Sequence, residues 1–211
     1  MMNRMKRYYR EVLFPWGLEK SLSGAVHSAA RKRLLSNAKG RVLEIGFGTG
    51  LNLPHYPEQV ERIVTIDPNA GMNGRAIKRI NESPIPVEHQ VLSGESLPLD
   101  SGSFDVAVST WTLCSIPDVN AALKELRRVL KPEGKFLFLE HGLSRDPGVA
   151  RWQKRLNGVQ QLIGDGCQLV RDFRELIPAA GFQFDEIEEY YQEKIPRTHG
   201  YTYRGVVSVT T

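Results

Sequence analysis

Three glycines stand at alternate positions in the stretch VLEIGFGTG, which spans residues 42–50 and begins with an apolar run. Glycine tolerates positive φ and lets a ligand approach the backbone closely. A helix that starts after such a loop offers free N–H groups and a partial positive charge at its first turn. Gly46, Gly48 and Gly50 therefore predict a ligand-binding loop between a buried strand and a helix.

Two acidic residues indicate which kind of ligand this loop binds. Asp67 ends the next apolar run, and a carboxylate there can accept hydrogen bonds from both hydroxyls of an adenosine ribose. Dinucleotide loops prefer the pattern G-x-G-x-x-G, whereas here the third glycine comes one position earlier and Leu51 takes its place. Glu44 lies two residues before Gly46. An acid at that point suits a sulfonium cofactor with an α-amino group better than a pyrophosphate.

The elements that position these residues follow from the apolar periodicity of the chain. Short apolar runs alternate with helical patterns, which predicts a mostly parallel sheet with helices on both faces. Ligands bind such sheets beyond the carboxyl ends of the strands. The last two strands follow one another without a helix, which predicts an antiparallel hairpin at the sheet edge. The expected strands are 41–46, 62–67, 86–92, 103–110, 135–141, 182–191 and 201–209, and the expected helices are 3–14, 19–37, 70–81, 118–130, 148–163 and 172–180.

Local signals set some of the element boundaries. Pro15 is expected to end or bend the first helix, Asp118 to cap the helix that begins there, and residues 131–134 to form a turn. Residues 1–40 are expected to form a helical cap that belongs to the same domain as residues 41–211. A chain of 211 residues fits one domain with a sizeable core.

The composition is typical of a globular protein and indicates in which compartment we expect it. The hydrophobic fraction of 41% and the charged fraction of 25% are ordinary for a globular protein, and no apolar run reaches the roughly 18 residues of a membrane helix. The N-terminal segment lacks the continuous apolar region of a secretory signal. Cys114 and Cys167 lie far apart and form no C-x-x-C pair, so we expect a cytoplasmic protein without a disulfide or a metal site.

The positive charge of the chain is concentrated at its start. Residues 1–41 contain ten Lys or Arg and two acidic residues, whereas the remainder is net acidic. The basic segment is either a solvated helical face or a peripheral contact for an anionic partner such as a membrane surface. The acidic remainder and the missing N-P-P-[YF] motif after the fourth strand predict no nucleic-acid partner. We expect a small-molecule substrate and predict no partner protein.

Four stretches of the chain occur in a known family. They are VLEIGFGTG, IDPNAGM, SGSFDVAVSTWTLCSIPD and LKELRRVLKPEGKFLFLEHG. Together they resemble class I S-adenosylmethionine-dependent methyltransferases, and within them the branch of the ubiquinone and menaquinone methyltransferases. The resemblance implies a Rossmann-like α/β fold with a mostly parallel seven-stranded sheet, an antiparallel C-terminal edge hairpin and an N-terminal helical cap. It also implies S-adenosyl-L-methionine as cofactor, converted to S-adenosyl-L-homocysteine.

The resemblance assigns cofactor contacts to individual positions. The glycines would pass the methionine part and the ribose, Glu44 would hold the amino end, and Asp67 would bind the ribose hydroxyls. Relatives carry an Asp in a G-D-A-E-x-L-P pattern where this chain has Ser93, so Glu95 or the backbone of residues 94–96 supplies the adenine contact. For Trp111, core packing is the alternative. The expected cofactor-binding residues are Glu44, Gly46, Gly48, Gly50, Asn52, Asp67, Pro68, Met72, Gly94, Glu95, Ser96, Thr110 and Trp111.

The second half of the chain resembles the animal thiol methyltransferases of the endoplasmic reticulum. The shared elements are L-C-S at 113–115, E-H at 140–141 and D-G-C at 165–167. This resemblance implies methyl transfer to a small, apolar acceptor, with a thiol or a sulfide as the first choice. Two other functions stay open. One is C- or N-methyl transfer to a lipid-like acceptor such as a quinol or a phospholipid, and the other is cofactor binding without catalysis.

His141 is the candidate catalytic residue. It ends a strand at the sheet edge where ligands bind, and its ordinary pKa suits proton removal near neutrality. Removing the proton of a thiol acceptor creates the thiolate, which is the real nucleophile. An acceptor without such a proton needs no base. The alternative for His141 is a structural, hydrogen-bonded histidine.

The cysteines and the aromatic residues of the cap could also take part in chemistry or substrate binding, but a structural role is the simpler interpretation. Cys114 and Cys167 are expected to be small buried side chains rather than reactive groups. The aromatic residues of the cap either wall the substrate pocket or pack along amphipathic helices. These aromatic residues are Tyr8, Tyr9 and Trp16.

Overall fold

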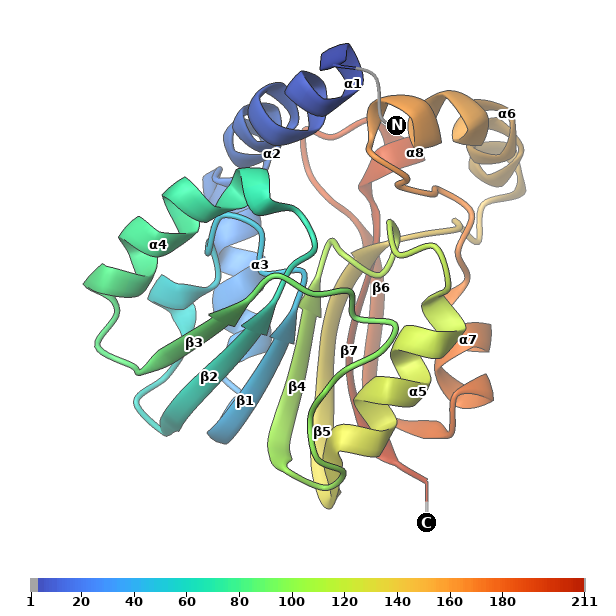
Figure 1. Cartoon of the computed structure of the whole chain (residues 1–211). Coiled ribbons are helices and arrows are strands. Elements are labelled where there is room, and N and C mark those ends of the chain that lie inside the picture. Colours follow the sequence, from blue (N-terminus) through green and yellow to red (C-terminus); the bar gives the residue numbers. More distant parts are fainter. Residues whose placement is uncertain (1–3, 211) are drawn as a thin grey trace.

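The computed structural model describes residues 4–210, and within this range seven strands form one sheet (Figure 1). The strands are β1 (Gly40–Ile45), β2 (Val60–Ile66), β3 (Val87–Gln90), β4 (Phe104–Thr110), β5 (Leu130–His141), β6 (Phe182–Tyr191) and β7 (Tyr201–Val209). Their order across the sheet is β3-β2-β1-β4-β5-β7-β6. Neighbours from β3 to β5 pair in parallel, whereas β7 pairs antiparallel with both β5 and β6. This confirms the predicted parallel sheet and its C-terminal hairpin.

Helices cover both faces of the sheet, because successive residues of a strand point to opposite sides. The helical elements are α1 (Arg4–Tyr8), η1 (Tyr9–Leu13), α2 (Phe14–Leu22), α3 (Ala25–Leu35), η2 (Leu53–His55), η3 (Ala70–Met72), α4 (Asn73–Glu82), α5 (Val119–Val129), α6 (Pro147–Ile163), α7 (Phe173–Ala179) and α8 (Arg197–Gly200). On one face Leu43 of β1 lies in a core with Leu126 of α5. On the other face Val42 lies in a core with Leu34 of α3. Asp118 caps α5 as predicted, since its side chain accepts a hydrogen bond from the backbone N–H of Ala121.

The N-terminal helical run does not end at Pro15. α1 leads through the π-helical turn η1 into α2, and Pro15 lies in the first turn of α2. The backbone N–H of Phe14 bonds the carbonyl of Tyr9, so the widened turn comes just before the proline. A proline fits the first turn of a helix because its missing N–H is not needed there.

Two other predicted boundaries are wrong. The helix expected over 19–37 is interrupted between α2 and α3, because Gly24 adopts extended backbone with ψ of 159°. Arg31 of α3 donates a hydrogen bond to the carbonyl of Leu22 at 2.7 Å and so satisfies the end of α2. The turn expected at 131–134 lies within β5, where it forms a bulge between the paired residues Leu130 and Lys135.

The carboxyl ends of the parallel strands face the N-terminal helices and α6. Figure 1 shows α1 and α2 at the same end of the sheet as α6 and α8. The hydroxyl of Tyr9 in η1 donates a hydrogen bond to the carbonyl of Ile163 at the end of α6. Two segments distant in sequence are thereby joined above the edge where ligands bind.

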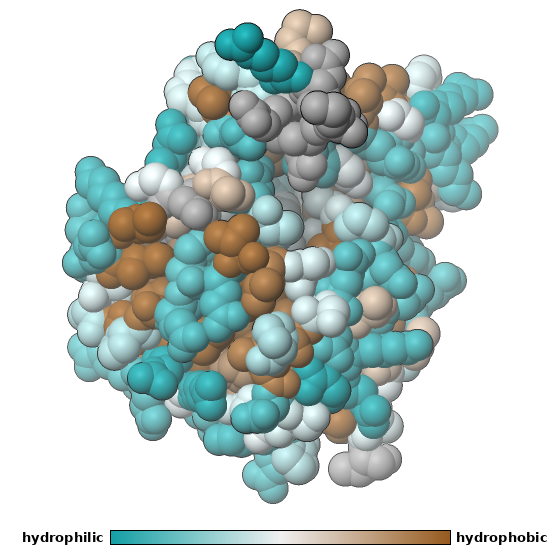
Figure 2. Space-filling view, viewed as in Figure 1, coloured by the Kyte–Doolittle hydropathy of each residue, from teal (hydrophilic) through white to brown (hydrophobic). Residues whose placement is uncertain are grey.

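The surface is mostly hydrophilic around α5 and carries hydrophobic side chains over α4 and β3 (Figure 2). Ile77 of α4 and Val91 after β3 are about half exposed there, with exposed fractions of 50% and 46%. None of the helices within residues 4–210 has the length and apolar character needed to cross a membrane.

Candidate active site

A cavity of about 1020 Å³ opens at the carboxyl ends of β1, β2, β4 and β5. Its walls come from the glycine loop, the N-terminal helices, the end of α6 and the loop that follows α6. Gly50 and Ser96 do not line it. Gly50 is buried at the end of the glycine loop, where its backbone N–H donates to the carbonyl of Phe47, and Ser96 is exposed. The predicted site residues that do line it are Glu44, Gly46, Gly48, Asn52, Asp67, Pro68, Met72, Gly94, Glu95, Thr110, Trp111 and His141.

Asp67 holds the glycine loop in shape. One carboxylate oxygen accepts a hydrogen bond from the backbone N–H of Gly48 at 2.7 Å, and the other accepts from the N–H of Asn69 at 2.8 Å. Burial raises the pKa of Asp67, and these two backbone hydrogen bonds partly offset the increase. Each oxygen keeps a further lone pair, so the carboxylate can still accept from a ligand hydroxyl.

Glu44 is the most deeply buried acid beside the glycine loop, with an exposed fraction of 1%. Asn52 donates to one carboxylate oxygen at 2.9 Å, and the hydroxyl of Tyr56 donates to the other at 2.6 Å. Burial raises the pKa of Glu44 to about 7, although these hydrogen bonds and the charge of Arg31 favour the ionised form. A cationic group that enters the cavity would favour the ionised form of Glu44 and so lower its pKa.

Glu95 ties together two loops at the cavity wall. One carboxylate oxygen accepts from the hydroxyl of Ser93 at 2.9 Å, and the other accepts from the backbone N–H of Asp118 at 2.7 Å. The carboxylate therefore connects the loop after β3 to the start of α5. Gly94 lies between Ser93 and Glu95 and lines the cavity with its backbone.

The N-terminal cap contributes residues that the sequence patterns did not indicate. The guanidinium carbon of Arg31 lies 4.6 Å from the ring centre of Trp111, and the ring of His27 meets the same indole edge-on at 5.1 Å. Trp111 has a positive φ of 49°, so its backbone turns sharply at the end of β4. Trp111 thus lines the cavity and also packs against the cap.

Of the two alternatives for the aromatic residues of the cap, the structure does not support the pocket wall, since Tyr8, Tyr9 and Trp16 are not among the residues that line the cavity. Tyr8 and Trp16 are exposed, with exposed fractions of 57% and 56%. Tyr9 bonds to Ile163 instead. The cap residues that do line the cavity are Phe14, Leu18, Glu19, Ser21, Leu22, His27 and Arg31.

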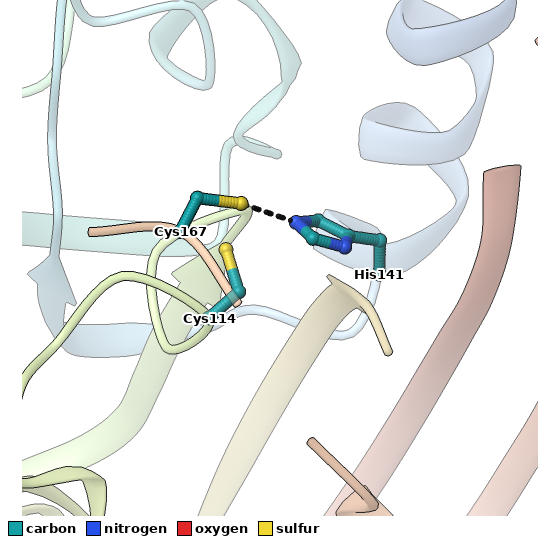
Figure 3. Close-up of side chains that lie close together, drawn as sticks. All are labelled: Cys114, His141 and Cys167. Carbon is teal, nitrogen blue, oxygen red and sulfur yellow. Dashed lines mark hydrogen bonds between the residues drawn. The ribbon is translucent and has the colours of Figure 1, made fainter. Parts of the chain in front are cut away.

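Two thiols and one imidazole meet at the cavity wall. We call Cys114, His141 and Cys167 the sulfur–imidazole cluster; their ligand atoms all lie within 4.8 Å of one another. Figure 3 shows both sulfur atoms beside the His141 ring, and Nε2 of that ring lies 2.9 Å from Sγ of Cys167. Both cysteines are buried, as predicted. Their proximity was not predicted, because the three residues come from three separate segments.

Hydrogen bonding sets the protonation of this cluster. A hydrogen bond with Cys114 and burial raise the pKa of Cys167, so its thiol stays protonated at neutral pH. Burial lowers the pKa of His141, but negative charge near the ring, including that of Glu140, outweighs this, and the net pKa is raised. Nδ1 of His141 has no hydrogen-bond partner among residues 4–210. The ring is therefore fixed by the sulfur of Cys167.

The buried carboxylate of Glu140 and the buried guanidinium of Arg171 fix the loop that carries Cys114. Glu140 is fully buried, and its carboxylate accepts hydrogen bonds from the backbone N–H groups of residues 112–114 at 2.9, 3.0 and 3.3 Å. Arg171 donates to the carbonyl oxygens of Leu113 and Ile116. Hydrogen bonds thus satisfy both backbone N–H groups and backbone carbonyl oxygens of the loop after β4.

Sequence comparisons assign this architecture to a family. Residues 43–138 match the methyltransferase domain family. The human thiol S-methyltransferase TMT1A is 34% identical over 174 residues, which cover 79% of this chain and 71% of that protein. The phosphatidylethanolamine N-methyltransferase of Cereibacter sphaeroides is 30% identical over 155 residues, which cover 71% of this chain and 75% of that protein. The chain belongs to the class I S-adenosylmethionine-dependent methyltransferases.

A solved methyltransferase structure shares the fold. A SAM-dependent methyltransferase from Thermotoga maritima superposes with a TM-score of 0.68 and covers 96% of this chain and 98% of that chain. The two sequences are 19% identical. The seven-stranded class I methyltransferase architecture expected from the sequence is therefore confirmed.

The cavity residues fit S-adenosylmethionine, the cofactor that the family implies. No described atom lies within 4 Å of a Cβ placed on Gly48, so the loop leaves room for a ligand against its backbone. The buried carboxylate of Glu44 suits the cofactor ammonium, and Asp67 has lone pairs for the ribose hydroxyls. When bound, the cofactor supplies a methyl group activated on a sulfonium.

S-adenosylmethionine is expected to bind about tenfold more tightly at pH 8 than at pH 6. Burial raises the pKa of Glu44 to about 7, so at pH 6 most of the protein must lose a proton from Glu44 before the carboxylate can pair with the cofactor. Calorimetric titrations at pH 6, 7 and 8 measure this dependence. Glu44→Gln is the control, because its amide does not titrate. The same pH dependence in that variant would exclude Glu44 as the group responsible.

Proposed function

We propose that this methyltransferase transfers the methyl group of S-adenosylmethionine to a thiol or sulfide acceptor. One geometric observation carries the proposal: an imidazole at the wall of the cofactor cavity already forms a hydrogen bond with a thiol sulfur. The thiol S-methyltransferase relatives, at 34% and 35% identity, support the same acceptor class.

In this proposal, His141 accepts the proton of the acceptor. A neutral thiol is a poor nucleophile, so the acceptor must become a thiolate before or during methyl transfer. The thiol of Cys167 is a weak hydrogen-bond partner, and an acceptor thiol can replace it at Nε2 of His141. Because its pKa is raised, Cys167 itself stays protonated and does not compete for the methyl group. The thiolate so formed would be the nucleophile for the methyl group that a bound S-adenosylmethionine would supply.

A lipid-like acceptor is the second candidate. The relative from Cereibacter sphaeroides carries the name of a phosphatidylethanolamine N-methyltransferase. Exposed apolar side chains also lie on the two segments that flank the cavity, at Leu13 and Trp16 in the N-terminal helices and at Trp152 and Leu162 in α6. Such side chains favour contact with a lipid surface. We keep this candidate as an alternative outcome of the activity test.

The test is methyl transfer from labelled S-adenosylmethionine to four acceptors. These are hydrogen sulfide, a short alkyl thiol, a demethylated quinol and phosphatidylethanolamine vesicles. We expect turnover with the sulfide or the thiol. Turnover with the quinol or the vesicles alone would replace the thiol proposal by the lipid one. Tight cofactor binding without turnover on any of the four would contradict both.

A further inference from the structure

We propose that the sulfur–imidazole cluster is a binding site for a soft divalent cation, zinc being the ion that fits best, and that the bound ion withholds His141 from the acceptor. The second half of this inference rests on the proposed function, because it assumes that His141 takes the acceptor proton. The first half concerns cation binding alone and is measured without any acceptor.

The donor set matches zinc chemistry. Thiolate sulfur and imidazole nitrogen are the preferred protein ligands of Zn²⁺, and two sulfurs with one nitrogen form a three-ligand site with a fourth position open. Tetrahedral Zn²⁺ with bonds of about 2.0–2.3 Å holds its donors roughly 3.5 Å apart. The donor atoms here lie within 4.8 Å, so they need to move by about an ångström to reach that geometry. The hydrogen bond between His141 and Cys167 marks where the ion would replace a proton.

The backbone already holds the three ligands beside one another. Cys114 lies on the loop fixed by Glu140 and Arg171, and His141 ends β5. The loop of Cys167 is tied to the first, since the backbone N–H of Gln168 donates to the carbonyl of Cys114 at 2.9 Å. A cation therefore finds its ligands placed by existing hydrogen bonds and does not have to gather them from mobile segments.

The charge balance of the cluster also suits a cation with two thiolates. Binding of Zn²⁺ to Cys114 and Cys167 forms two metal–sulfur bonds and releases two protons to water, which leaves the ion and its thiolates neutral together. The buried guanidinium of Arg171 places a positive charge beside the cluster, where it donates to the carbonyl oxygens of Leu113 and Ile116 on either side of Cys114. The carboxylate of Glu140, next to His141, balances the charge of that guanidinium.

An ion at this site would change the role of His141. Coordination would occupy the nitrogen lone pair that the base needs, and all three ligand residues line the cavity. With zinc bound, the imidazole cannot accept a proton from the acceptor. The cluster would therefore make methyl transfer sensitive to free zinc.

The test begins with cation binding to full-length protein that has been stripped with a chelator. We expect a single Zn²⁺ per chain by elemental analysis and calorimetry, and Cd²⁺ should produce a thiolate charge-transfer absorption. Cys114→Ser and Cys167→Ser should each weaken the affinity at least tenfold. His55→Ala is the matched control, because His55 bonds to Ser28 outside the cavity. Equal zinc affinity in the cysteine variants and the wild type would overturn the site.

The second measurement asks whether the ion withholds the imidazole. Diethyl pyrocarbonate modifies free imidazole nitrogen, so zinc should protect His141 from this reagent, as read by mass spectrometry. Zinc should also inhibit thiol methylation, a chelator should reverse the inhibition, and Mg²⁺ should have no effect. Zinc binding without protection of His141, or with unchanged or faster methylation, would overturn the blocking role. Zinc binding and protection without turnover on any acceptor would support the site while refuting the proposed function.

Discussion

Replacing His141 by alanine is expected to lower kcat for a thiol acceptor by about 100- to 10,000-fold, which is the range of general-base catalysis. The affinity for S-adenosylmethionine should change little, because the predicted cofactor contacts lie on the glycine loop and at or after the ends of β2, β3 and β4, and do not include His141. Single-turnover rates with a short alkyl thiol and calorimetric cofactor titration measure the two quantities separately. His55→Ala again serves as the control for loss of an imidazole, since His55 lies outside the cavity.

The pH profile distinguishes a base from a structural histidine. An imidazole accepts a proton only in its neutral form, so kcat/KM of the wild type should rise with pH through the pKa of His141. That pKa is raised, because nearby negative charge outweighs burial, and the rise in kcat/KM should therefore lie above the ordinary pKa of histidine. In His141→Ala the rate should follow the ionisation of the free thiol instead. A similar profile in both proteins, or a loss of rate explained by lower stability, would exclude the base role.

The parts of the fold that the sequence predicted depend on local patterns. The central strands β1, β2, β4 and β5 contain apolar runs, and the alternation of strands and helices admits few topologies. The position of the glycine loop follows from the same rule, since it comes directly after β1 at the carboxyl edge of the sheet. Asp67 was identifiable because it ends the neighbouring strand, and its carboxylate reaches the N–H of Gly48.

The parts that the sequence did not predict depend on contacts between distant segments. Nothing local to Cys114 or Cys167 indicates that their sulfur atoms meet beside His141. Arg31 lies in a basic helix with no motif, yet it stacks on Trp111 at the cavity wall. The sequence placed Glu140 in a strand but did not indicate that its buried carboxylate accepts hydrogen bonds from the loop after β4. Which buried backbone groups a polar side chain contacts depends on tertiary packing, and short sequence patterns do not predict those contacts.

Two alanine substitutions in the glycine loop are expected to separate folding from cofactor binding. A Cβ on Gly46 would lie 1.9 Å from Oγ1 of Thr112, whose backbone is fixed by Glu140, and φ at Gly46 is +70°. Gly46→Ala should therefore lower the free energy of unfolding by about 3 kcal/mol through overpacking and backbone strain. Thermal or urea unfolding of the ligand-free protein measures this loss. A stability close to that of the wild type would show that the loop can move away from Thr112.

Gly48→Ala should affect cofactor binding more than folding. Its φ is +56°, and no described atom lies within 4 Å of the added Cβ, so the cost to folding is about 1–2 kcal/mol from the backbone alone. Gly102 has the same two properties, a φ of +63° and open space, but lies outside the cavity, which makes Gly102→Ala the matched control. Both variants should unfold at similar denaturant concentrations, and Gly48→Ala alone should lose at least tenfold in S-adenosylmethionine affinity. Equal affinity in the two variants would mean that the open space at Gly48 is not where the cofactor passes, and the assignment of the loop would have to move to other residues of the cavity.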